Sequence, residues 1–132
     1  MLYPMFSLVM LTLIIGILTI RARVMSIVKR QISMKFYQLM EGSEVPEAIT
    51  KTTRCFNNLF EVPVLFYVAA TLYIALEITS HLAIGLAWIF VGLRLIQAYI
   101  HLGYNNVYHR LVSFWLGFFT VIAIWLNLMF LL

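Results

Sequence analysis

Residues 54–76 read RCFNNLFEVPVLFYVAATLYIAL, and in them a polar cluster runs directly into a long apolar segment. The apolar part, residues 59–76, is long enough to span the hydrocarbon core of a membrane at about 1.5 Å per residue. Polar and charged side chains at membrane depth are costly, so they are usually paired and often functional. The stretch therefore predicts a membrane-spanning helix with a polar site at one end.

Three further apolar runs, at about residues 2–20, 82–100 and 111–132, complete the pattern. Of the 132 residues, 64% are hydrophobic and 11% are charged. A soluble domain of this size could not bury so much apolar surface. The charges follow the first run instead of preceding it, which favours a first membrane helix over a signal peptide. We therefore predict an all-α integral membrane protein, a four-transmembrane-helix bundle formed by one domain of residues 1–132.

The basic residues predict the orientation of the chain. The net charge is +4, and most of the positive charge precedes or begins the second apolar run: Arg21, Arg23, Lys29, Arg30, Lys35, Lys51 and Arg54. Cationic loops favour the cytoplasmic side, so residues 21–54 and 103–109 should lie there and both termini on the opposite side. Charges beside a membrane span indicate contact with anionic lipid rather than nucleic acid. The absence of organelle signals and the compact chain favour a bacterial inner membrane, with an intracellular membrane as the alternative.

The polar cluster falls on one face of an expected helix. Pro46 followed by Glu47 is typical of a helix start. A helix continuing from there places Arg54, Asn58 and Glu61, spaced i, i+4 and i+7, on the same face. Pro63 lies inside this helix, so we expect a kink.

Two more cations are expected to meet this face. Arg94 lies in the third run about six residues, or ~9 Å, from its cytoplasmic end, with Gln97 and His101 on the same face. Arg110 begins the fourth run. We expect Arg94 to pair with Glu61, the carboxylate at comparable depth. The result is either a pocket with several cations and one carboxylate, or a structural ion pair that fixes helix register.

The remaining reactive residues give no further site. Cys55 is the only cysteine, so an internal disulfide is impossible, and we interpret it as a packing residue. The three histidines are scattered and do not form a recognisable set of metal ligands.

The pattern Arg54-x-x-x-Asn58-x-x-Glu61-x-Pro63, followed by Arg94 and Arg110, resembles the MAPEG family. These are membrane-associated proteins in eicosanoid and glutathione metabolism, and they include the microsomal glutathione transferases. The resemblance covers nearly the whole chain. It implies a homotrimer that binds glutathione, its co-substrate, between neighbouring subunits near the cytoplasmic side.

The resemblance also implies roles for particular residues. Arg110 is the expected catalytic residue, which stabilises the glutathione thiolate. The expected glutathione ligands are Arg21, Lys51, Arg54, Asn58, Glu61, Arg94 and His101. Glutathione has two carboxylates and one ammonium group, so a site with several cations and one glutamate is complementary to it. Asn57 and His101 depart from the family pattern, because some members have arginine and tyrosine at these positions.

The activity expected from this resemblance is a glutathione-dependent transferase or peroxidase that acts on hydrophobic, lipid-like electrophiles. A cation beside the sulfur favours the thiolate, which is the nucleophile. The alternative is a non-catalytic lipid-binding or scaffold member of the same fold. A small transporter has less support, because the sequence lacks an inverted repeat.

Overall fold

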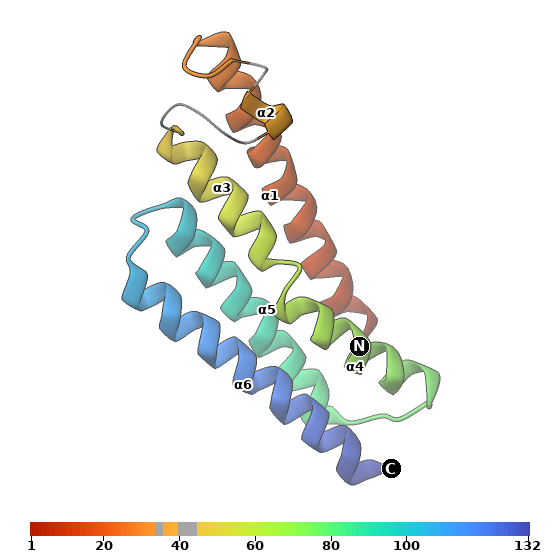
Figure 1. Ribbon diagram of the computed structural model, residues 1–132. Coiled ribbons are helices and arrows are strands. Elements are labelled where there is room, and N and C mark those ends of the chain that lie inside the picture. The colour runs from red at the N-terminus through yellow and green to blue at the C-terminus, as the bar shows by residue number, and fades with distance from the viewer. Residues whose placement is uncertain (34–35, 40–44) are drawn as a thin grey trace.

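The computed structural model describes residues 1–33, 36–39 and 45–132, and most of these residues are helical. The elements are α1 (Leu2–Val28), α2 (Phe36–Leu39), α3 (Glu47–Asn58), α4 (Val62–Ala75), α5 (His81–Leu102) and α6 (Val107–Leu131). The long helices lie alongside one another (Figure 1). Both termini lie towards the end of the bundle opposite α2 and the α5–α6 turn.

Four helical segments of the described chain are long and apolar enough to cross a membrane: Leu2–Val28, Glu47–Ala75, His81–Leu102 and Val107–Leu131. This finding confirms the predicted all-helical membrane protein with four spans. The first helix is longer than predicted and continues to Val28, so Arg21 lies inside it. The second helix starts where predicted, with Pro46 as its N-cap.

Small side chains let the helices approach closely in the core. Ala69 and Ala70 of α4 and Ala83 and Ala87 of α5 are fully buried. Small residues are common where membrane helices pack. The hydrophobic effect does not drive helices together within lipid, so association depends on van der Waals contact, and small side chains let the backbones come close. At the end of the bundle opposite α2, the Tyr73 hydroxyl donates to Asn127 Oδ1 at 2.8 Å and links α4 to α6.

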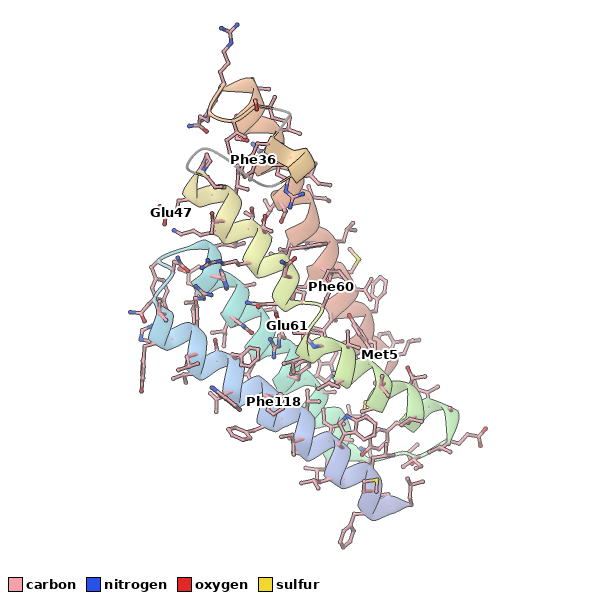
Figure 2. The ribbon with its side chains drawn as sticks, viewed as in Figure 1. Met5, Phe36, Glu47, Phe60, Glu61 and Phe118 are labelled. Atoms are coloured by element: carbon pink, nitrogen blue, oxygen red, sulfur yellow. The ribbon has the colours of Figure 1, made fainter. Side chains whose placement is uncertain are left out.

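The second span is broken, and the prediction of one helix continuing through Glu61 is wrong. Helix α3 ends at Asn58, and α4 begins at Val62 with Glu61 as its N-cap residue. Pro63 lies in the first turn of α4, where its missing N–H is harmless because that N–H has no helical acceptor. Pro63 therefore starts a new helix instead of kinking a continuous one, and Glu61 lies at the junction (Figure 2).

Candidate functional site

Five polar side chains meet where the end of α3, the second half of α5 and the start of α6 come together. We call this group the inner polar cluster: Asn58, Arg94, Gln97, His101 and Arg110. A cavity of about 220 Å³ is lined by Asn58, Gln97 and Arg110, and a very small one beside it by Asn58, Arg94, Gln97 and His101. Three residues from α5 belong to the cluster because they recur every three or four positions on one helical face.

Arg94 is the most deeply buried member of the inner polar cluster, with 1% of its surface exposed. Its Nη1 donates to Gln97 Oε1 at 2.6 Å, and its Cζ lies 4.9 Å from the ring centre of Phe90 and 5.6 Å from that of Phe114. Its Nε and Nη2 have no hydrogen-bond partner among the described residues. A buried guanidinium with free N–H groups is a strong donor to an anion.

The expected ion pair between Glu61 and Arg94 does not form. Within residues 1–33, 36–39 and 45–132, the only ion pair joins Lys51 Nζ to Glu47 Oε1, at 2.7 Å. Glu61 is exposed at the junction of α3 and α4, whereas the Arg94 side chain packs against α6. The second span breaks at Glu61, which continuous helical periodicity did not predict, and Gln97 is the hydrogen-bond partner of Arg94.

Gly117 of α6 makes room for the Arg94 guanidinium. A Cβ atom at this position would lie 2.9 Å from Arg94 Nη2 and 3.4 Å from Cζ. Contacts as short as 2.9 Å force a shift, and the two aromatic rings leave the guanidinium little space. Glycine at this position therefore allows α6 to pass close beside the buried cation.

His101 connects α5 to α3. Its Nε2 lies 3.3 Å from Asn58 Nδ2, within hydrogen-bonding distance. His101 Nδ1 is buried and has no partner in the described part of the chain. The structure thus brings together two of the predicted ligands, one from each helix, and leaves one polar atom of the pair available.

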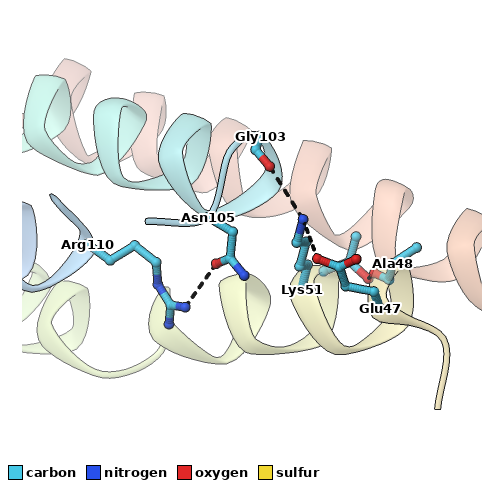
Figure 3. Close-up of polar contacts among 7 residues, drawn as sticks. Glu47, Ala48, Lys51, Gly103, Asn105 and Arg110 are labelled. Atoms are coloured by element: carbon cyan, nitrogen blue, oxygen red, sulfur yellow. Dashed lines mark hydrogen bonds and ion pairs between the residues drawn. The ribbon is translucent and has the colours of Figure 1, made fainter. Parts of the chain in front are cut away.

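Arg110 lies in the first turn of α6 and lines the larger cavity. Its Nη1 donates to Asn105 Oδ1 at 3.0 Å (Figure 3). Its Nε is buried and lacks a hydrogen-bond partner among the residues described. The apolar side chains of Val107, Leu111 and Phe114 line the same cavity, so a cation and an apolar surface face one space.

The other predicted ligands lie outside the inner polar cluster. Arg21 and Lys51 line a separate groove of about 570 Å³ between α1, α3 and the end of α5. Lys51 pairs with Glu47 there and donates to the Gly103 carbonyl at 3.4 Å (Figure 3). Arg54, one turn before Asn58, is exposed like Glu61. A single chain therefore does not bring all the predicted ligands together.

The family model described as the MAPEG family matches residues 1–130. The chain belongs to the MAPEG family. No curated protein and no solved structure gives a significant match to the chain. Membership in the MAPEG family confirms the resemblance noted in the sequence and associates this chain with glutathione or eicosanoid metabolism.

The donor set of this MAPEG protein suits an anionic ligand. Free N–H groups of Arg94 and Arg110 lie in one cluster with His101, and no carboxylate of the described chain pairs with either arginine. Carboxylates and thiolates are complementary to such donors. Among the described residues, no group of three or more His, Cys, Asp or Glu side chains is placed to hold a metal ion.

Two residues of this MAPEG site escaped the sequence analysis as functional candidates, Gly117 and Asn105. Helical spacing puts Gly117 on the same face of the fourth run as Arg110, but its role beside Arg94 is recognisable only when α6 is placed against that arginine. Asn105 gave a weak signal, because it belongs to a Gly-Tyr-Asn-Asn turn in which an asparagine can adopt the left-handed conformation. That signal predicts a helix end, but it does not identify the side chain that the asparagine contacts.

Proposed function

We propose that this MAPEG protein is a glutathione-dependent transferase or peroxidase that acts on hydrophobic electrophiles in the membrane. The observation that supports this proposal is the presence of free, buried N–H groups on Arg94 and Arg110, which line two adjacent cavities that have Asn58 and Gln97 in common. Burying a cation without a counter-charge costs free energy, and a bound anion recovers part of that cost. Because the chain belongs to the MAPEG family, we propose that this anion is glutathione.

Each polar group of glutathione has a complementary side chain in this proposal. Arg54, Arg94 and His101 bind the carboxylates and the peptide together with Asn58, and Glu61 binds the ammonium group. Arg54 and Glu61 are both exposed in a single chain, and Glu61 directly precedes the apolar helix α4, where an unpaired charge is costly. A ligand or another subunit should therefore cover Glu61. In the homotrimer that we propose, Arg21 and Lys51 of a neighbouring subunit complete the site.

Arg110 supplies the chemistry in this scheme. Its positive charge stabilises the thiolate, so the thiol proton is lost to water near neutral pH. In a conjugation, the sulfur electron pair forms the bond to the electrophilic carbon and the leaving group departs with its own pair. Val107, Leu111 and Phe114 line the same cavity, which suits an apolar electrophile entering from the bilayer. The protein mainly positions two reactants from different phases.

A second candidate is a non-catalytic lipid-binding or scaffold protein of the same fold. A groove of about 640 Å³, lined almost entirely by apolar side chains of α1, α3 and α4, favours this function. Gly16, Phe56, Phe60 and Tyr67 are among the residues that line it. This candidate predicts binding of a lipid chain without glutathione chemistry.

We place α2 and the α5–α6 turn on the cytoplasmic side of a bacterial inner membrane, with both termini opposite and all residues in one domain. The basic side chains of the groove that holds Arg21, Lys29 and Lys51 support this orientation. Tagging the two termini and the α5–α6 turn with a membrane-impermeant label tests it in intact cells.

Calorimetric titration with glutathione tests the proposed function. The intact protein in detergent is expected to bind glutathione saturably, and Glu61→Gln is expected to lower the affinity about 10- to 100-fold, because a charged hydrogen bond is lost. Glu77→Gln is the matched control: it removes the same charge in the turn after α4, at the opposite end of the bundle. Saturable lipid binding without glutathione binding would instead establish the second candidate, and equal affinities in both variants would remove Glu61 from the site.

A further inference from the structure

The turn between α5 and α6 is held in one conformation by its own backbone. Asn105 has a φ of 52°, in the left-handed region, and its N–H donates to the Ile100 carbonyl at 2.8 Å. The Gly103 N–H donates to the Tyr99 carbonyl at 2.9 Å. Asparagine tolerates the left-handed region better than other non-glycine residues, so Asn105 closes the end of α5 at little cost.

Contacts from both neighbouring helices fix the turn further. The Asn106 side chain caps α6 by accepting from the His109 N–H at 3.2 Å. From α3, Lys51 Nζ donates to the Gly103 carbonyl at 3.4 Å (Figure 3). With its backbone held in this way, the Asn105 side chain is a fixed acceptor beside the first turn of α6.

The Asn105 side-chain oxygen accepts a hydrogen bond from Arg110, the residue that we propose stabilises the glutathione thiolate. We propose that Asn105 is a positioning residue that acts through Arg110, an inference that rests on the proposed function. The 3.0 Å hydrogen bond from Arg110 Nη1 to Asn105 Oδ1 restrains the guanidinium of this long, half-buried side chain. The buried Arg110 Nε–H has no partner in the described chain and stays available to the ligand.

The chemical type of the acceptor matters as much as its position. A carboxylate at position 105 would also orient the guanidinium, but its negative charge would weaken the stabilisation of a thiolate. The neutral amide of Asn105 orients Arg110 without neutralising it. Among the described residues, Arg110 forms no ion pair, so its full charge can act on a bound anion.

The variant Asn105→Gly tests this role, because glycine accepts a positive φ and removes only the acceptor. We expect kcat for conjugation of glutathione to a chlorodinitrobenzene to fall about 10-fold, since misplacing a catalytic group by ~1 Å costs up to about 100-fold. The KM for glutathione should change less than about 3-fold, because the other proposed ligands are intact. The control Asn106→Gly keeps the backbone carbonyl that accepts from the Arg110 N–H at 3.1 Å and removes only the side chain that caps α6. Glycine is itself an adequate cap residue and the Asn106 side chain does not touch the guanidinium, so kcat should change less than about 2-fold.

A double variant separates positioning from general damage to the fold. If Asn105 acts through Arg110, then adding Asn105→Gly to Arg110→Ala causes no further loss of kcat. The same 10-fold loss in both backgrounds would overturn the proposal. The absorbance of the bound thiolate gives a second readout: its titration should move to higher pH in Asn105→Gly and stay in place in Asn106→Gly.

Nuclear magnetic resonance of arginine-labelled protein tests the hydrogen bond without relying on turnover. The Arg110 guanidinium should rotate slowly in the intact protein and faster in Asn105→Gly. Equal rotation in both would overturn the positioning role even if the protein lacks glutathione chemistry. Failure of the proposed function is distinct, because it would show as absent glutathione binding in the intact protein.

Discussion

Replacing Arg110 by alanine is expected to lower kcat for glutathione conjugation about 100- to 1000-fold, the usual cost of removing one donor that stabilises developing or full negative charge. The affinity for glutathione should fall less than about 10-fold, because Asn58, Arg94 and His101 remain. Initial rates with a chlorodinitrobenzene give kcat, and calorimetry gives the dissociation constant.

Two further variants make this result specific to the guanidinium. Arg110→Lys keeps the charge but not the planar fork that reaches Asn105 Oδ1, so an intermediate kcat is expected. His109→Ala changes an exposed neighbour in the same turn and should leave kcat unaffected. Unchanged turnover in Arg110→Ala would remove Arg110 from the chemistry, whatever its effect on binding.

The second large effect is expected at Gly117, which lies against the buried guanidinium of Arg94. In Gly117→Ala the new methyl group would lie 2.9 Å from Arg94 Nη2, so either the arginine or α6 must move. Overpacking of this kind typically lowers the free energy of unfolding by about 1 to 3 kcal/mol. We expect a lower thermal midpoint in detergent together with weaker glutathione binding, because the displaced Arg94 loses its contact with Gln97.

Gly92→Ala is the matched control for this prediction. Gly92 lies on α5 near Arg94, and a Cβ there would meet nothing within 4 Å. Alanine should therefore leave binding intact and stabilise α5 slightly, by up to about 1 kcal/mol in an exposed helix interior. If Gly117→Ala and Gly92→Ala unfold and bind alike, then Gly117 is not needed to accommodate the cation.

The sequence by itself determined the class of the protein and the number of its spans. Apolar runs of about 20 residues have no stable place outside a membrane, and the length of each run fixes a helix. The start of α3 at Pro46 also followed from the sequence, since proline and an acidic residue suit a helix N-terminus. The resemblance carried by Arg54, Asn58, Glu61 and Pro63 identified the family, which the family model confirms.

Local periodicity did not determine how the second span is interrupted. A proline within an apolar run is compatible with a kink in one helix or with the first turn of a new one. Here the chain leaves the helical conformation after Asn58 and resumes it at Val62. This difference moves Glu61 off the helical face that it would share with Arg54 and Asn58.

Only the tertiary structure decided which groups meet Arg94 and Arg110. A long arginine side chain can reach several neighbours, and its choice depends on the rotation and separation of adjacent helices, which a single helix's periodicity does not specify. Gln97 binds Arg94, Gly117 leaves it room, and Asn105 holds Arg110. The sequence thus placed cations at membrane depth, and packing determined which of their N–H groups stay free for a ligand.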